Sequence, residues 1–491
     1  MSNVVNHWIN GVEYVSKSGR TSPIYDPALG TETKRVALAN QSEIDAAIKA
    51  ARDSFPAWRD ASLAKRQQII FTFRELLNSR KGELAEIITS EHGKVLSDAL
   101  GEITRGQEVV EFATGIPHLL KGFYSENVST GVDVYSTRQP LGVVGIISPF
   151  NFPAMVPMWF FPIAIAAGNT VVIKPSEKDP SASMWVAKLW KEAGLPDGVF
   201  NVLNGDKESV DGLLNSPDVE SISFVGSTPI AKYIYENASR TGKRVQALGG
   251  AKNHMLVLPD ADLELVADSA INAGFGSAGE RCMAISVVVA VEPVADQLIP
   301  KIVERMGKLR TGDGRRGCDM GPLVTREHRD KVASYVDIAE KDGATILVGG
   351  SRIDREDLNK GWYFPPTVID DCLSKMKCVQ DESFGPIMTI ETFESVDEAI
   401  ALGNDTIYGL AGAVWTKDID KAQRVANQLR HGTIWINDYH PYVPQAEWGG
   451  FKQSGFGREL GPMGLAEYQE AKHVWQNLKP GPSNWFDGKE Q

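Results

Sequence analysis

Cys282, in the segment GSAGERCMA (276–284), has the type and surroundings of a candidate nucleophile. Small residues precede it, so backbone can approach whatever binds there. The adjacent Arg281 could help to stabilise a thiolate, which is the form in which cysteine attacks a carbonyl carbon. Taken alone, the pattern fits a buried structural cysteine at least as well as a catalytic one.

Asn151 offers a complementary group. It lies in SPFNFPAMVP (148–157), directly after the apolar run GVVGII (142–147). A side-chain amide at the end of a strand can donate a hydrogen bond to an oxyanion that develops during a reaction. An asparagine that only forms a turn in a proline-rich loop is the ordinary alternative.

Two further motifs also follow apolar runs. In KPSE (174–177), Lys174 and Glu177 could hydrogen-bond ribose hydroxyl groups, and a solvated ion pair is the common alternative. FVGST (224–228) ends a strand and opens a helix, so a glycine followed by Ser227 could bring a pyrophosphate to the helix N-terminus. These strand ends carry no G-x-G-x-x-G, the usual dinucleotide fingerprint.

Alternating apolar runs and helical patterns position these motifs. We predict strands at 142–147, 170–175, 200–205 and 220–227, separated by helices at 181–193, 207–215 and 228–240. Such alternation indicates a doubly wound parallel sheet, which binds ligands at the carboxyl ends of its strands. A second alternating block from about residue 255 to 428 predicts a second α/β domain. Before them we predict helices at 64–91 and 96–120, and one that begins at Ser42 with Asp45 completing a capping box.

Composition excludes several classes of protein. With 63 acidic and 51 basic residues the net charge is −12, so the chain lacks the basic surface that binds nucleic acid. Four cysteines are too few for disulfides to stabilise a chain of 491 residues. The sequence has no cluster of cysteine and histidine, so a structural zinc site has little support. Residues 139–173 carry no charge, but their five prolines favour a buried core over a membrane span. No signal-peptide pattern opens the chain, so we expect a cytoplasmic protein.

The order of the motifs is more specific than any one of them. The chain resembles the NAD(P)-dependent aldehyde dehydrogenase superfamily over essentially its whole length, through SPFNFP, KPSE, FVGST, ALGGAKN (247–253), GERC, DESFGP (381–386) and GGFKQSGFGREL (449–460). The resemblance implies a Rossmann-type NAD domain, an α/β catalytic domain and a small oligomerisation hairpin. Its implied boundaries are 1–122, 142–250 and 449–471 for the NAD domain, 251–448 for the catalytic domain, 123–141 for the hairpin and 472–491 for a tail.

The resemblance also implies roles. Cys282 attacks the aldehyde, and Asn151 with the Cys282 backbone amide forms the oxyanion hole. Transfer of hydride to NAD leaves a thioester on the cysteine. Lys174 and Glu177 bind the adenosine ribose, Glu382 binds the nicotinamide ribose, and Phe384 packs near that ring. Further cofactor contacts are implied at Ser148, Phe150, Lys178, Ser227 and Gly249.

The motif ALGGAKN departs from the hydrolytic pattern. Most hydrolytic members begin it with a glutamate that activates water, whereas this chain has Ala247 and an additional Ala251. The surrounding sequence is similar to CoA-acylating methylmalonate-semialdehyde dehydrogenases, in which coenzyme A resolves the thioester. A site without a general base hydrolyses an acyl intermediate slowly. The thiol of coenzyme A can attack as a thiolate and therefore depends less on a general base.

That similarity implies a carboxylated substrate. Arg105 and Arg281 match family positions near the substrate, where two guanidinium groups could hold a carboxylate. For either arginine alone an ordinary ion pair is as good an interpretation. Methylmalonate or malonate semialdehyde is the implied substrate, with decarboxylation and formation of propionyl-CoA or acetyl-CoA.

The C-terminal segment 436–461 differs, because it resembles the hydrolytic betaine-aldehyde type. There Glu459 matches a carboxylate that can serve as a secondary proton acceptor. A hydrolytic NAD-dependent dehydrogenase that forms a free acid therefore remains the alternative, and a non-catalytic NAD-binding protein is a further one. Residues 123–139 and the tail after Lys472 could pair with each other. The resemblance implies instead that they pair across subunits in a homodimer or homotetramer.

Overall fold

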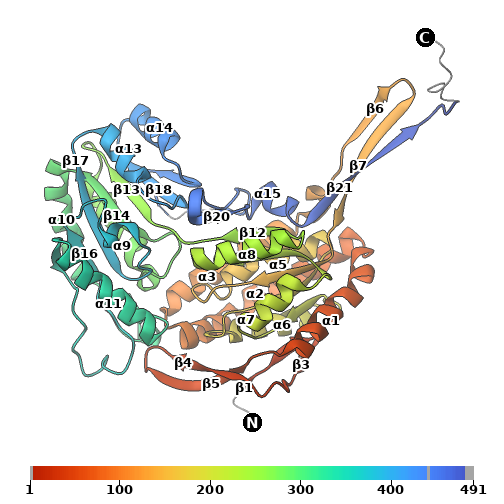
Figure 1. Cartoon of the computed structure of the whole chain (residues 1–491), viewed down its shortest axis with the longest axis horizontal. Coiled ribbons are helices and arrows are strands. Elements are labelled where there is room, and N and C mark those ends of the chain that lie inside the picture. Colours follow the sequence, from red (N-terminus) through yellow and green to blue (C-terminus); the bar gives the residue numbers. More distant parts are fainter. Residues whose placement is uncertain (1–3, 440–442, 482–491) are drawn as a thin grey trace.

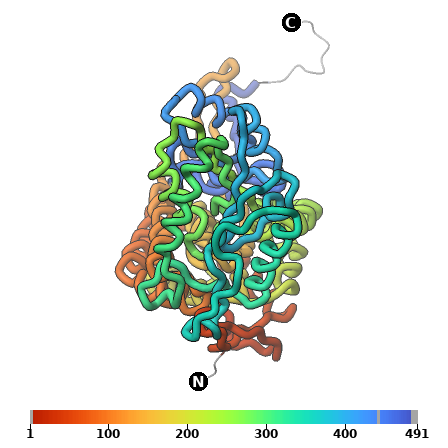
Figure 2. The backbone as a smooth tube through the Cα atoms, turned by 90° about the vertical axis from the view of Figure 1, so that its left-hand side faces the viewer, coloured from red at the N-terminus to blue at the C-terminus, as the bar shows by residue number. Residues whose placement is uncertain are grey.

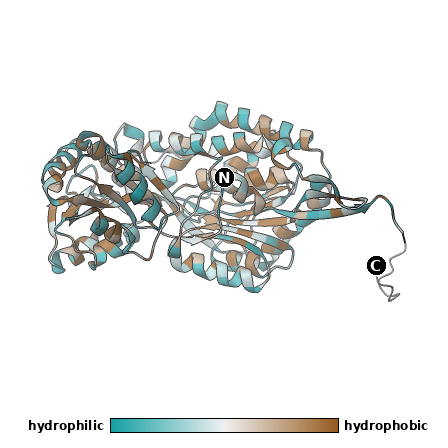
Figure 3. Cartoon of the chain, turned by 90° about the horizontal axis from the view of Figure 1, so that it is seen from above, coloured by the Kyte–Doolittle hydropathy of each residue, from teal (hydrophilic) through white to brown (hydrophobic). Residues whose placement is uncertain are grey.

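The computed structural model describes residues 4–439 and 443–481. Two α/β lobes lie side by side, and a thin three-stranded arm projects from the larger one (Figure 1). The N-terminal strands lie at the opposite end of the molecule from the arm (Figure 2). Seen from above, apolar strands are enclosed by helices that turn polar faces outward (Figure 3). The predicted α/β class is confirmed.

An eight-stranded sheet forms the centre of the larger lobe. Its order is β20-β12-β11-β8-β9-β10-β2-β3. The strands are β2 (His7–Ile9), β3 (Val12–Tyr14), β8 (Val143–Ile147), β9 (Thr170–Lys174), β10 (Phe200–Val202), β11 (Val219–Val225), β12 (Arg244–Leu248) and β20 (Gly455–Phe456). The five strands from β12 to β10 are parallel. Chain order reverses between β8 and β11, where a doubly wound sheet opens its ligand crevice.

Helices cover both faces of this sheet. They are α1 (Gln41–Arg59), α2 (Leu63–His92), α3 (Leu96–Ala113), α4 (Ile116–Leu119), α5 (Met155–Ala167), α6 (Ser181–Glu192), α7 (Lys207–Asn215), α8 (Thr228–Arg240) and α15 (Gly461–Ala466). The predicted capping box at Ser42 is wrong. Asn40 caps α1, because its side chain accepts from the Glu43 amide while the Glu43 carboxylate accepts from the Asn40 amide. The predicted helix 96–120 breaks after Ala113, where Gly115 and Pro117 interrupt it.

A seven-stranded sheet forms the smaller lobe. Its order is β15-β16-β17-β14-β13-β18-β19, with β15 antiparallel at one edge. The strands are β13 (Asn253–Val257), β14 (Ile285–Val291), β15 (Thr345–Val348), β16 (Thr367–Asp370), β17 (Ile387–Phe393), β18 (Ala411–Trp415) and β19 (Thr433–Ile436). The helices of this part of the chain are α9 (Leu263–Phe275), η1 (Gly276–Gly279), α10 (Glu292–Met306), η2 (Gly314–Arg316), α11 (Arg326–Lys341), α12 (Lys377–Gln380), α13 (Val396–Asn404), α14 (Ile419–Gln428) and η3 (Lys452–Ser454).

The arm consists of β6 (Tyr124–Ser129), β7 (Val132–Pro140) and β21 (Gln469–Asn477). β21 pairs antiparallel with β7 along nine residues of the same chain. For these residues the expected pairing with a neighbour's tail is therefore wrong, and pairing with each other is right. The Arg244 guanidinium donates to the carbonyls of Ala466, just before β21, and Gln469, its first residue. Residues 482–491 of the predicted tail lie outside the described residues.

Two features remain. A small sheet near the N-terminus joins β1 (Val4–Val5), β5 (Thr31–Ala37) and β4 (Thr21–Asp26). The uncharged stretch 139–173 contains β8, α5 and β9, whose residues are all buried in the larger lobe. Within residues 4–439 and 443–481, we find no helix with the length and apolarity needed to cross a bilayer.

Candidate active site

A cavity of about 210 Å³ opens where the order of the eight-stranded sheet reverses. The loop after β8 and the end of β11 supply one side of it, and the smaller lobe supplies the other. Its lining is Pro149, Phe150, Asn151, Lys178, Val225, Gly226, Ser227, Gly249, Gly250, Cys282, His328, Lys331, Glu382 and Phe384. We call it the cofactor-side cavity. It brings together most of the predicted cofactor residues with the predicted nucleophile.

A second cavity, of about 440 Å³, reaches the same cysteine from the other side. Its lining is Ser97, Asp98, Gly101, Glu102, Arg105, Phe152, Met155, Arg281, Cys282, Met283, Asp438 and Tyr439. We call it the substrate-side cavity. Because Cys282 lines both cavities, its thiol lies where a group from either side can reach it.

The turn before the nucleophile is strained. Ser277 and Ala278 adopt left-handed backbone angles, with φ of 52° and 53°, and Gly279 follows at 73°. Non-glycine residues hold such angles only where their surroundings enforce them. The carboxylate of Asp98 does so here, since it accepts from the Ser277 amide at 2.8 Å and from Arg281 Nη2 at 2.8 Å.

Burial raises the pKa of the Cys282 thiol to about 12, and the nearby Glu382 carboxylate adds to the rise. Arg281 opposes this, as the sequence suggested, but it is a minor influence on the pKa. Its guanidinium is already paired with Asp98. The structure therefore holds the resting cysteine as a thiol.

Asn151 is 4% exposed and lines the cofactor-side cavity beside Cys282. Its Nδ2 donates to the Glu280 carbonyl at 3.0 Å. An amide nitrogen carries two hydrogens, so the second remains available to an oxygen atom of a ligand bound in the cavity. The bond to Glu280 also ties Asn151 to the backbone two residues before the nucleophile.

Both predicted substrate arginines line the substrate-side cavity. Each also has a carboxylate partner: Arg281 binds Asp98, and Arg105 Nη1 lies 2.9 and 3.0 Å from the two carboxylate oxygens of Glu108. A substrate carboxylate that binds these arginines would therefore share them with the Asp98 and Glu108 carboxylates or displace those carboxylates.

Lys174 and Glu177 follow β9 at the same edge of the sheet, and their charged atoms are 3.3 Å apart. Burial opposes the charge of Glu177, yet Lys174, a backbone amide and Lys178 together lower its pKa, so it is ionised at neutral pH. The Ser148 hydroxyl is buried without a hydrogen-bond partner among the described residues. A lysine, an ionised carboxylate and an unsatisfied hydroxyl suit the polar groups of a dinucleotide.

Glu382 and Phe384 enter the cofactor-side cavity from the smaller lobe. Glu382 Oε1 accepts from the Ala251 amide at 2.9 Å, and burial raises the pKa of its carboxyl to about 7. A side chain at Gly250 would clash with it, since a Cβ there would lie 2.3 Å from Glu382 Oε2. The Phe384 ring stands edge-on to Phe150, with centroids 6.0 Å apart.

Glu459 lies elsewhere. Its carboxyl is fully buried, with the Tyr468 hydroxyl 3.4 Å from each oxygen, and burial raises its pKa well above the usual range. Among the described residues, the linings of the two cavities do not include it. Glu459 therefore lines neither of the cavities that Cys282 lines, although the sequence singled out both residues.

Some residues of the site were not predicted from the sequence. Asp98, Glu102 and Tyr439 line the substrate-side cavity. Asp98, Glu102 and Arg105 are spaced by four and three residues, which places them on one face of α3. That spacing is the signal that could have found the first two.

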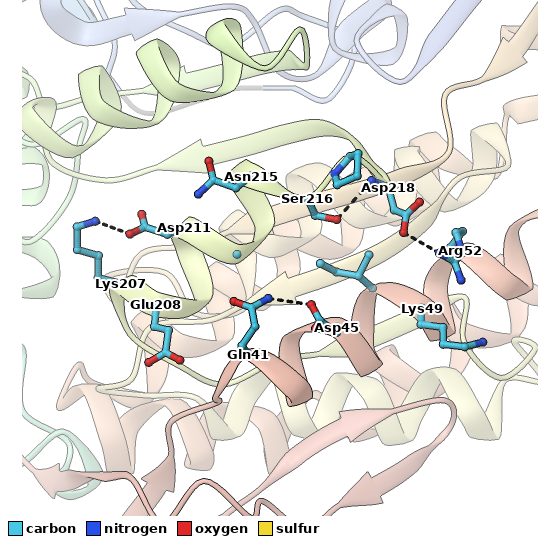
Figure 4. A pocket seen from close by; sticks show the side chains of 13 residues that line it. Gln41, Asp45, Lys49, Arg52, Lys207, Glu208, Asp211, Asn215, Ser216 and Asp218 are labelled. Atoms are coloured by element: carbon cyan, nitrogen blue, oxygen red, sulfur yellow. Dashed lines mark hydrogen bonds and ion pairs between the residues drawn. The ribbon is translucent and has the colours of Figure 1, made fainter.

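A further cavity, of about 780 Å³, lies between α1 and α7 (Figure 4). Two pairs of opposite charge lie within its lining, Lys207 with Asp211 and Arg52 with Asp218. We assign no ligand to this groove.

Comparison with known proteins agrees with this geometry. The profile of the aldehyde dehydrogenase family matches residues 14–474. Malonate-semialdehyde dehydrogenase of Pseudomonas aeruginosa is 45% identical over 478 residues, covering 96% of each chain. The crystal structure of methylmalonate-semialdehyde dehydrogenase from Oceanimonas doudoroffii has a TM-score of 0.95 and 44% identity, covering 98% of this chain and 99% of that one.

The second subfamily suggested by the sequence is also represented. Betaine aldehyde dehydrogenase of Staphylococcus aureus, solved in complex with NAD+, has a TM-score of 0.95 and 38% identity, covering 98% of this chain and 96% of that one. The matching family profile and these relatives show that the chain belongs to the aldehyde dehydrogenase family.

Proposed function

We propose that this protein is an NAD-dependent, CoA-acylating dehydrogenase of malonate or methylmalonate semialdehyde. The observation that carries the proposal is the position of Cys282 between a cavity with dinucleotide-binding groups and a cavity lined by Arg105 and Arg281. The relatives named for these two semialdehydes support the choice of substrate.

The chain's own residues account for acylation of the enzyme. The Cys282 thiol first loses its proton to water, and the thiolate sulfur then adds to the aldehyde carbon. Asn151 Nδ2 with the Cys282 amide binds the oxygen that becomes negative. NAD, when bound, supplies the hydride acceptor, held by Lys174, Glu177 and Glu382. Loss of hydride from the tetrahedral carbon leaves a thioester on Cys282.

Ala247 determines what happens next, because its methyl group cannot accept a proton from water. The thiolate of coenzyme A attacks the thioester without a general base, and Cys282 leaves as the other thiolate. Before this transfer, a malonyl or methylmalonyl thioester on Cys282 loses carbon dioxide, because the bond to the carboxylate carbon breaks. The electron pair passes to the carbonyl oxygen in the oxyanion hole, and protonation of the α-carbon then gives the acetyl or propionyl thioester.

The hydrolytic alternative is favoured by the betaine-aldehyde-like segment 436–461 and by the betaine aldehyde dehydrogenases among the relatives. Residues 440–442 of that segment lie outside the described residues. The position of Glu459 weighs against its use as the hydrolytic base, because its carboxyl is fully buried and lines neither cavity at Cys282.

We further propose a cytoplasmic homo-oligomer, a dimer or tetramer, with the domain boundaries given by the sequence. The arm exposes Phe123, Tyr124 and Trp475 at 72%, 64% and 68%. Three strands have too little bulk to bury these rings, so a second copy of the chain is the natural cover. A sedimentation coefficient of a monomer that does not change with concentration would contradict this assembly.

Pre-steady-state kinetics test the acyl acceptor. With malonate semialdehyde and NAD but no coenzyme A, we expect a burst of about one NADH per site followed by slow turnover. Addition of coenzyme A should restore steady turnover and yield acetyl-CoA and carbon dioxide. Rapid, sustained NADH release without coenzyme A, lost in Glu459→Gln, would establish the hydrolytic alternative.

A further inference from the structure

A buried ion pair borders the substrate-side cavity and has no part in the chemistry described above. Lys94 Nζ lies 2.7 Å from Glu102 Oε2, and neither side chain is exposed. Lys94 lies between α2 and α3, and Glu102 is on α3. Removing two charges from water is unfavourable unless further hydrogen bonds satisfy them. The groups that complete this pair therefore indicate what it holds.

Both partners hold the loop that carries Asn151. Lys94 Nζ donates to the Asn151 carbonyl at 2.6 Å. Glu102 Oε1 accepts from the amides of Ala154 and Met155 at 2.8 and 3.1 Å. Ala154 is the N-cap of α5 and its methyl group cannot cap, so Glu102 supplies the missing acceptor and a favourable negative charge.

The same helix also fixes the other half of the oxyanion hole. Asp98, one turn before Glu102 on α3, holds the left-handed turn at Ser277 and the guanidinium of Arg281. One face of α3 therefore sets the position of Asn151 through Glu102 and Lys94, and the position of Cys282 through Asp98. A donor for an oxyanion must be placed to within a fraction of an ångström to be effective.

We propose that Lys94 and Glu102 are positioning residues for the oxyanion hole. The pair fixes the Asn151 amide relative to Cys282 and acts on hydride formation only through Asn151. This inference rests on the oxyanion role of Asn151 in the proposed function. Neither Lys94 nor Glu102 binds the reacting atoms.

The paired variant Lys94→Met/Glu102→Gln tests this without leaving one buried charge alone. The glutamine carbonyl oxygen can still accept from the α5 amides, so the helix keeps its cap while the Asn151 carbonyl loses its donor. We expect the NADH burst with saturating malonate semialdehyde and NAD to slow by about 10²-fold, as for a misplaced catalytic group. The KM for NAD should change by less than about twofold, because the ribose contacts are untouched.

A double-mutant cycle with Asn151→Ala separates positioning from general damage. Asn151→Ala alone should slow the burst by about 10²- to 10³-fold. Added to that background, the paired variant should cost less than about twofold further, because the group it positions is gone. An equal loss in both backgrounds, or a normal burst in the paired variant alone, would overturn the inference and leave the oxyanion role intact.

Two controls complete the design. Lys243 is another buried lysine that donates to two backbone carbonyls, those of Ser216 and Val219, and it lines neither of the two cavities. Lys243→Met should lower the melting temperature and leave the burst rate unchanged, and a slowed burst would mean that burial alone explains the effect. An unchanged burst in Asn151→Ala would overturn the oxyanion role itself, and the inference with it.

Discussion

The two cavities that meet at Cys282 are built in different ways. The cofactor side is lined by the loops that follow the parallel strands β8, β11 and β12, together with groups from the smaller lobe. The substrate side depends on one face of α3, where Asp98, Glu102 and Arg105 are all committed to ion pairs. The first follows from the fold, whereas the second depends on a few side chains, so specificity can change without disturbing the sheet.

The shared residue should give the largest effect. Cys282→Ala should lower the rate of NADH formation by about 10³-fold or more, because the covalent intermediate on Cys282 can no longer form. NAD should still bind, as measured by quenching of tryptophan fluorescence. The matched variants Cys318→Ala and Cys372→Ala should retain normal chemistry. An active Cys282 variant would remove the whole mechanism.

On the substrate side, Arg105→Ala should weaken kcat/KM for malonate semialdehyde by about 1.5–3 kcal/mol, or about 10- to 150-fold. The reason is the loss of a charged hydrogen bond to the substrate carboxylate. A neutral aldehyde such as propanal should be spared. The control is Arg74→Ala on α2, whose guanidinium pairs with Glu111 at the surface. Equal losses for both substrates would show that Arg105 is structural.

On the cofactor side the expected effect is smaller. Glu177 is ionised and should repel a 2′-phosphate, so NAD should be preferred over NADP by at least about tenfold in kcat/KM, or 1.4 kcal/mol. Glu177→Gln should lower the ratio of kcat/KM for NAD to kcat/KM for NADP. Equal kcat/KM for the two cofactors in the unaltered protein would show that Glu177 is turned away from the ribose.

The smallest effect concerns Glu459, which belongs to neither side. Its raised pKa means that the folded chain keeps a proton that the unfolded chain releases above about pH 4.5. The folded state therefore loses stability as pH rises, and Glu459→Gln removes that loss. Relative to the parent, the variant's melting temperature should rise by about 1–3 °C per unit from pH 5 to pH 8. A constant difference would mean that the carboxyl is ionised in the fold.

The sequence predicts the elements with strong periodicity and misses those defined by pairing. β8, β9, α7 and α8 begin and end within one or two residues of their expected positions, because apolar period and turn residues act locally. β12, which carries Ala247, was not predicted. Its backbone pairs with β11 on one side and, on the other, with β20, which lies more than 200 residues later in the chain. The local sequence pattern does not indicate so distant a partner.

The site shows the same division. Motif order identified Cys282, Asn151, Glu382 and both arginines, and the structure brings them around two cavities. The sequence did not reveal which carboxylates neutralise the arginines, because Asp98 and Arg281 are 183 residues apart. It also could not show that Glu459 is fully buried, since burial is a property of the assembled core.

Two strands are made last, one that completes the eight-stranded sheet and one that completes the arm. β20 and β21 lie between residues 455 and 477, whereas their partners β12 and β7 end at residues 248 and 140. Synthesis on the ribosome runs at about 5–20 residues per second. The edges of β12 and β7 that will bind β20 and β21 therefore stay unpaired while the smaller lobe is translated. Nascent chains must keep these edges from pairing with one another for that interval. A chain truncated before residue 455 would lack β20 and β21, so the edges of β12 and β7 would stay unpaired. We expect such a chain to be degraded by proteases.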